Sequence, residues 1–246
     1  MSIAIDSRNA GAKSAGATSI SWTHTVGAAL VSGFLHVGAS TGSGTAVSIS
    51  AVVWDSGGAN TGLSKTVNAV DTELTDTANN LKTSWWWLAP PAAGAKTILV
   101  TAASSCELEA GSSSWSGCAG TFNAASPQKT NRGANTNPTT TVTSAVGEQV
   151  IDVIGVNLGS GVTAVEGASQ TLIFNQNNGP ATSIGAGSDE ASTGATVTMD
   201  WTGMTVNTND TNQICVSLIP AVAAAPATAR RSSRPFPFRP GSPRSR

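Results

Sequence analysis

Residues 45–54 read Thr45-Ala46-Val47-Ser48-Ile49-Ser50-Ala51-Val52-Val53-Trp54. From position 47 to position 53 the odd-numbered residues are apolar, and serine fills the first two even positions between them. Successive side chains of a β-strand point to opposite faces, so this alternation predicts a strand with one face in a core and the other in water. We expect Val47, Ile49, Ala51 and Val53 to share the buried face.

The same pattern extends along most of the chain. Apolar alternation bounded by Gly-rich joints predicts many short strands. They are expected at 17–26, 28–38, 45–55, 63–70, 81–89, 95–103, 105–110, 114–122, 139–145, 148–157, 170–176, 182–188, 195–201 and 212–219. This spacing is typical of an all-β fold, and we predict an antiparallel, jelly-roll-like β-sandwich over residues 1–220.

Composition agrees with this fold class. The 246 residues include 26 glycines, and only 11% are charged and 5% aromatic. Such a mixture disfavours long helices and suits strands joined by tight turns, and the length fits one large sandwich domain. No stretch has the apolar length of a membrane span, and the N-terminus lacks the basic and apolar pattern of a signal peptide. We therefore expect a chain without a membrane span.

Charge divides the chain into a body, residues 1–220, and an arm, residues 230–246, joined by an Ala/Pro linker at 221–229. The arm holds six of the 13 basic residues and none of the 14 acidic ones. The arginines are Arg230, Arg231, Arg234, Arg239, Arg244 and Arg246. The arm therefore carries +6 and the body −7.

This charge split suggests how the arm is used. An irregular cationic arm fits the acidic surface of another copy of the chain, with Phe236 and Phe238 as its apolar anchors. Phosphates of a nucleic acid would also attract the arm, but the acidic body would repel them. We expect the partners to be copies of the chain or other proteins of the same assembly, and we disfavour nucleic acid.

The three cysteines leave two alternatives open. Cys106 and Cys118 flank a predicted hairpin at 107–117 and would face each other across it, as a disulfide requires. Three reduced, buried thiols are the other interpretation. Cys215 lies in an apolar run and is expected to be buried. Because no C-x-x-C pair or nearby histidine accompanies them, we predict no metal site.

The run Trp85-Trp86-Trp87 supplies the candidate contact residues. In a strand Trp85 and Trp87 share one face and Trp86 takes the other, so at least one indole is exposed unless both faces are covered. In the carbohydrate-binding alternative, Trp86 is expected to be the exposed platform. An exposed indole could stack on a sugar ring, whereas a subunit interface or core packing would need no ligand.

No catalytic arrangement survives inspection. Residues 38–42 match the G-x-S-x-G motif of hydrolases, but a strand is predicted after it and no histidine follows His36, so we expect a Gly/Ser turn. His24 and His36 are expected to be core or surface residues rather than members of a triad.

The acidic residues are expected to be solvated. Asp71, Glu73 and Asp76 lack the order of a calcium loop. Glu107 with Glu109, or Asp189 with Glu190, could pair for glycoside hydrolysis only if both carboxylates faced one cleft. We predict a protein that is not an enzyme and has no cofactor.

Several stretches carry a resemblance. They are Ser21-Trp22-Thr23-His24-Thr25-Val26-Gly27 and Ala195-Thr196-Val197-Thr198-Met199-Asp200-Trp201, together with 87–91, 96–101, 142–145, 150–153 and 185–188. Over roughly residues 15–220 the chain resembles a loosely characterised group of β-sandwich proteins found among tailed-phage virion proteins and bacterial surface proteins. The group has no established catalytic residues, and the arm departs from it.

The resemblance implies a structural or adhesive role. Our first expectation is a virion structural protein, such as a capsid decoration or tail subunit, that self-associates through its sandwich and its arm. The alternative is a carbohydrate-binding or adhesive module, extracellular or on a cell surface.

Overall fold

The computed structural model describes residues 1–222 except 29, 31, 43–45, 79, 134–135, 159–162, 180–182 and 205–207. Among these residues every regular element is a β-strand and all pairing is antiparallel, which confirms the all-β sandwich-like fold. Within this described part, no helix is long and apolar enough to cross a membrane. The arm, including Arg230, Arg231, Arg234, Phe236, Phe238, Arg239, Arg244 and Arg246, lies outside the described residues.

The first sheet is built around two very long strands that pair along their whole length, β1 (Ala4–Val26) and β9 (Gly94–Ser116). The other edge of β9 pairs with β3 (Ile49–Trp54) near its start and with β2 (Phe34–Gly42) near its end. The sheet is completed by β4 (Thr61–Gly62), β8 (Leu81–Leu88) and β7 (Glu73–Asp76). Because two strands share one edge of β9, the sheet curls into a half-barrel.

Two further sheets and a small hairpin complete the fold. The second sheet has the order β10 (Cys118–Phe122), β18 (Thr208–Pro220), β13 (Gln149–Leu158), β16 (Ser183–Ala191) and β15 (Thr171–Asn177), with β11 (Gln128–Arg132) also on β18. The third contains β12 (Thr139–Thr143), β17 (Thr196–Thr202) and β14 (Val165–Glu166). β5 (Thr66–Val67) and β6 (Val70–Asp71) form the hairpin.

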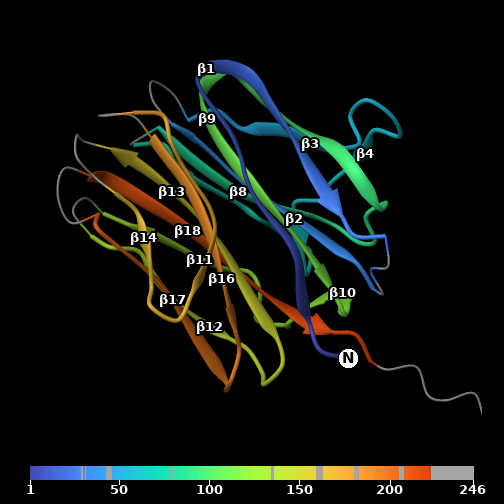
Figure 1. Ribbon diagram of the computed structural model, residues 1–246. Coiled ribbons are helices and arrows are strands. Elements are labelled where there is room, and N and C mark those ends of the chain that lie inside the picture. Colours follow the sequence, from blue (N-terminus) through green and yellow to red (C-terminus); the bar gives the residue numbers. More distant parts are fainter. Residues whose placement is uncertain are drawn as a thin grey trace, which may run out of the picture.

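The sheets stack in layers, as Figure 1 shows, with a hydrophobic cluster in each gap. One cluster fills the concave side of the half-barrel and includes Trp54, Trp86 and Leu108. A second lies between the first two sheets, and two smaller ones lie beneath the third sheet. The central strands are therefore covered on both faces, and every residue of β2 is buried.

Burial on both faces corrects the expectation of a turn at residues 38–42. These residues form the second half of β2 and pair with β8 and β9. Gly38 and Gly42 face the second sheet, where an added Cβ would lie 2.8 Å from Val153 Cγ2 and 2.4 Å from Ser183 Cβ, respectively. The small residues of the motif let the two sheets approach each other closely.

A bulge changes the face pattern of the stretch at 45–54. Val47 and Ile49 are buried as predicted, but the buried positions then shift to Val52 and Trp54. The pairing of β3 with β9 shifts register between Ile49 and Ala51. An extra residue in a bulge moves all later side chains to the opposite face, so the strand was predicted correctly and half of its buried face was not.

The predicted hairpin at 107–117 and the disulfide across it are wrong. Residues 94–116 form one continuous strand, and all three cysteines are free and buried. Cys106 belongs to the half-barrel cluster and Cys118 to the cluster between the sheets. Ten residues of extended chain separate Cys106 from the end of β9, roughly 30 Å, far beyond the span of a disulfide.

Candidate functional site

The three consecutive tryptophans enter two different cores. Trp85 and Trp87 point toward the second sheet, and Trp86 points into the half-barrel. Trp86 is only 5% exposed, and its Nε1 donates a hydrogen bond to Ser84 Oγ at 2.8 Å. The expectation that Trp86 is the exposed contact residue is wrong, because the curled sheet covers the second face of β8. Trp87, at the end of the strand, is the half-buried one.

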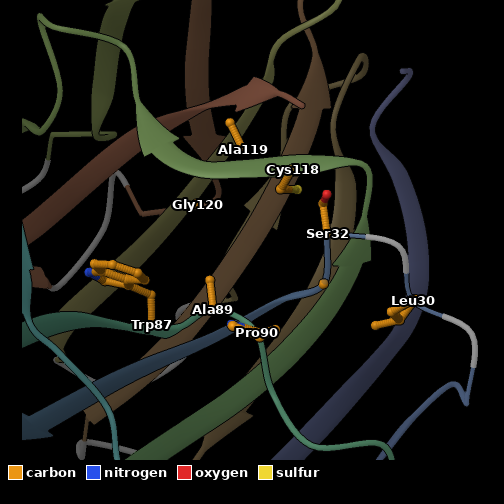
Figure 2. Close-up of a pocket in the computed structure, with 9 residues that line it drawn as sticks. Leu30, Ser32, Trp87, Ala89, Pro90, Cys118, Ala119 and Gly120 are labelled. Carbon is orange, nitrogen blue, oxygen red and sulfur yellow. The ribbon is translucent and has the colours of Figure 1, made fainter. Parts of the chain in front are cut away.

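Trp87 lines a surface pocket of about 510 Å³. Figure 2 shows Trp87 on one side of this pocket and Leu30 on the other, with Ala89 and Cys118 between them. The complete lining is Leu30, Ser32, Gly33, Trp87, Ala89, Pro90, Cys118, Ala119 and Gly120. These residues come from the β1–β2 connection, the end of β8 and the start of β10, so three distant segments form the site.

The Trp87 indole is held in a fixed orientation. It stacks on Phe34 with a centroid separation of 6.0 Å and an interplanar angle of 7°. Phe122 meets it edge-on at 5.0 Å. Its Nε1 donates to the carbonyl of Thr66 at 2.9 Å. With its only donor used internally, the indole offers the pocket an apolar surface.

The described residues that line the pocket carry no charge. Burial raises the pKa of the Cys118 thiol to about 12, so that side chain is neutral at ordinary pH. Among these described residues, Ser32 contributes the only side-chain hydroxyl group. A sugar site needs several converging donors and acceptors, whereas prolines and aromatic rings need mainly an apolar, preformed surface. The lining is uncharged and offers one fixed indole face, two features that suit a proline-rich or aromatic segment.

The pocket lies beside the point where the chain leaves the body. Cys118 pairs with Pro220, the last residue of β18. The amide of Ala221 donates to the carbonyl of Gly117 at 2.7 Å, and the N-terminal amine donates to the carbonyl of Ala221 at 3.0 Å. Val222, which follows, is 91% exposed. The linker therefore starts next to this pocket.

His24 is buried within a chain of hydrogen bonds inside the half-barrel. Its Nε2 lies 3.0 Å from Ser114 Oγ, which donates to Asp6 at 2.6 Å. Its Nδ1 lies 2.9 Å from Ser112 Oγ, which accepts from Trp22 Nε1. Because the Ser114 proton is used by Asp6, Nε2 is the donor to Ser114 Oγ. The Ser112 hydroxyl keeps its proton to donate to Nδ1, and this arrangement suits the neutral ring.

The histidines do not form a catalytic triad. In a triad the carboxylate orients the histidine, whereas here Asp6 contacts the serine and His24 lies between two serines. Burial lowers the pKa of His24 to about 4 against a smaller opposing effect of Asp6. His36 is fully buried against Trp85, at 4.9 Å between ring centroids, and burial lowers its pKa to about 3. Both histidines are core residues.

Glu107 and Glu109 form a buried carboxyl pair that sequence reasoning did not recognise. They lie two residues apart on β9, face the second sheet, and are 6% and 0% exposed. Ser183 on β16 joins them, with its Oγ 2.9 Å from Glu107 Oε2 and 2.5 Å from Glu109 Oε1. The Ser183 amide also donates to Glu107 at 2.9 Å. Because both carboxyl groups are buried, they do not face an open cleft of the kind that glycoside hydrolysis requires.

Proton accounting gives the state of Glu109. A single hydroxyl can donate to only one of the two carboxyl groups, so the second contact of Ser183 Oγ requires a proton from one of the two acids. Burial raises the pKa of Glu109 to about 8, against smaller opposing effects of its hydrogen bonds with Ser183 and Asn178. Glu109 is therefore a neutral acid that links the first two sheets at neutral pH.

Asp152 links the second sheet to the third. Its Oδ1 accepts from the amide and hydroxyl of Ser188, both at 2.8 Å. Its Oδ2 accepts from Trp201 Nε1 at 2.7 Å and Gln213 Nε2 at 2.8 Å. Burial raises the pKa of this carboxyl. Four donors on one buried carboxylate are typical of a structural anchor.

Three of the acids considered as candidates are paired with cations of the chain itself. Lys65 bridges Asp71 and Glu73, and Lys82 also reaches Glu73 at 3.1 Å. Arg8 binds Asp189 through two hydrogen bonds of 2.8 and 2.9 Å. Across the described residues, no group of three or more His, Cys, Asp or Glu side chains is placed to hold a metal ion.

The sequence held only a weak signal for these features. The alternation around Leu108 predicted a strand at 105–110, but it could not show that a second sheet covers the face that carries Glu107 and Glu109. The pocket has no sequence signal, because its three segments are joined only by folding.

Comparison with protein-family models, with curated proteins and with solved structures finds no match to this chain.

Proposed function

We propose that this protein is a non-enzymatic structural subunit of a phage virion, such as a capsid decoration or tail subunit. It self-associates through its β-sandwich and its cationic arm. The observation that carries this proposal is the charge split, with +6 in residues 230–246 and −7 in the rest. Opposite charges on two parts of one chain favour contacts between copies.

The use of the ionisable groups supports the absence of an enzymatic role. Asp152, Glu109 and His24 all complete hydrogen-bond networks between or within sheets. Such networks consume the groups that catalysis would need free. A rigid body of stacked sheets with a separate basic arm suits a building block, and the resemblance to virion proteins agrees with this role.

Light scattering tests the proposal. The solution mass of the full chain is compared with that of a chain cut after Thr228, at low and high ionic strength. We expect large full-length assemblies and a monomeric cut chain, and electron microscopy should show ordered particles. Equal masses of both chains at every salt concentration would refute assembly through the arm.

Trp87 favours a second candidate function, a carbohydrate-binding or adhesive module. Its half-buried indole lies at a pocket, and sugar rings stack on such surfaces. The test is a glycan screen of the cut chain, followed by titration of Trp87→Ala with any glycan that binds. Binding that survives this substitution would exclude the pocket as the sugar site.

A further inference from the structure

The pocket beside Trp87 and the arm have complementary chemistry. The described lining is uncharged and combines apolar side chains with polar backbone atoms and the Ser32 hydroxyl, and it includes one fixed indole face and Pro90. The arm contains the sequence Pro235-Phe236-Pro237-Phe238-Arg239, the apolar segment of an otherwise Arg- and Ser-rich stretch. Proline-rich segments bind aromatic-lined grooves because their extended form loses little entropy on binding.

We propose that the pocket of one copy binds the Phe236–Phe238 segment of a second copy. This inference rests on the proposed function and names the contact through which the arm assembles the protein. Phenylalanine side chains would fill the space between Trp87 and Leu30, and the flanking arginines would lie on the acidic body around it.

Position and reach allow this contact. Val222 leaves the body next to Gly117, which adjoins the pocket residue Cys118. The 13 residues at 223–235 separate it from Phe236. Fully extended, they would span about 40 Å, enough to pass from one copy to the pocket of its neighbour.

The proposed self-association places the arm in the pocket of a second copy. Two bodies of formal charge −7 repel each other, and a cationic segment between them reduces that repulsion. An arm of +6 inserted from one copy into the next supplies that cation at the contact. An arm that returned to its own pocket would not be available for a contact between copies.

The first test changes only the arm. The full-length double variant Phe236→Ser/Phe238→Ser keeps all six arginines, and Ser232→Ala/Ser233→Ala serves as the control in the same segment. Loss of two buried aromatic side chains should weaken association roughly tenfold to hundredfold by light scattering. Urea unfolding of the double variant beside the native chain checks that the substitutions leave the stability of the body unchanged.

The second test closes the pocket. Ala89→Leu extends a side chain into the space beside Trp87, and Ala195→Leu makes the same change at an exposed position just before β17. Only Ala89→Leu should weaken association, by a similar factor. Urea unfolding of both variants, cut after Thr228, checks that the body remains stable.

Mixing the Ala89→Leu chain with the double arm variant shows whether the pocket binds the arm of another copy or of its own chain. Ala89→Leu has a working arm, and the double arm variant has an open pocket, so docking between copies predicts that the mixture forms a heterodimer neither chain forms alone. If each variant is a monomer alone and the mixture also stays monomeric, the arm returns to its own pocket. That result would overturn the proposal.

The two proposals can fail separately. If the chain cut after Thr228 assembles like the full chain, assembly through the arm fails. If truncation abolishes assembly but the Phe and Ala89 variants assemble normally, the arm acts by charge alone and the pocket proposal fails.

Discussion

Single residues show how this fold accommodates polar groups in its core. His24 and Glu109 are each fully buried, and burial shifts the pKa of each toward the side that favours its neutral form. A neutral group avoids the cost of burying a charge, which exceeds that of a hydrogen-bonded polar group. The price is a stability that depends on pH, in opposite directions for the two residues.

For His24 we expect stability to fall in acid. Its pKa is lowered from 6.5 to about 4, so its contribution is complete above pH 6.5 and is lost as the pH falls toward 4. The loss amounts to about 3 kcal/mol by linkage. Because the chain has two histidines, NMR can follow both rings directly. A His24 ring that titrates near pH 6.5 would contradict the neutral network.

For Glu109 the direction is reversed. Its pKa is raised from 4.5 to about 8, so its contribution is complete below pH 4.5 and is lost as the pH rises toward 8. From pH 6.5 to pH 8, urea unfolding of the native protein should show a loss of about 2 kcal/mol. Glu109→Gln keeps a neutral donor and should remove this loss.

The matched control for that experiment is Glu190→Gln, since Glu190 is only partly buried and accepts a hydrogen bond from Ser169 at 2.9 Å. It should keep the native pH dependence. An unchanged slope in Glu109→Gln would show that the carboxyl is already ionised at pH 6.5.

At the scale of elements, the close contact of β13 and β16 with the first sheet depends on glycines, which have no side chain to separate the sheets. A Cβ on Gly155 would lie 2.1 Å from Thr83 Oγ1 and 2.5 Å from Ser40 Oγ. One on Gly185 would lie 2.7 Å from Glu109 Cβ. Glycine at these positions lets the first two sheets pack closely enough for Ser183 to reach both acids of β9.

We expect Gly155→Ala to destabilise the protein by about 1–3 kcal/mol, because the added methyl group forces the sheets apart. Gly62→Ala is the control, since nothing lies within 4 Å of its added Cβ. Urea unfolding measures both. If the two substitutions cost the same, the close approach of the sheets does not limit stability.

On the scale of the whole molecule, the layered sheets account for the stability of the body, and we expect charge to control the association of chains. Within the body, ionisable groups such as Arg8 and Asp189 pair with each other. In the sequence of the arm, six arginines stand without an acidic residue. Forces between exposed charges are screened over about 10 Å at 0.1 M salt and about 3 Å at 1 M. The association of whole chains should therefore depend on ionic strength, and the stability of the body much less.

We expect the mass of the full-length assembly to fall as salt rises from about 0.05 to about 0.5 M, because screening weakens contacts between the arm and acidic surfaces. The chain cut after Thr228 should keep one mass throughout. Light scattering at several salt concentrations measures this, and an assembly strengthened by salt would point to apolar contacts alone.

The sequence alone determined the fold class, because alternation with a period of two residues is a local property of a strand. The charge split and the absence of long helical patterns were equally visible. The positions of most strands followed, whereas the single long strand at 94–116 did not, since Gly111 and its serine neighbours looked like a hairpin turn. Local composition cannot show that two long strands support each other.

Tertiary structure alone decided which face of each strand is buried and what the buried groups do. Trp86 is covered because the first sheet curls, and Glu109 is neutral because a second sheet lies over it. The pocket at Trp87 exists because three segments distant in sequence meet at one end of the body. Burial and pKa depend on neighbours brought close by folding, and a linear pattern does not contain those neighbours.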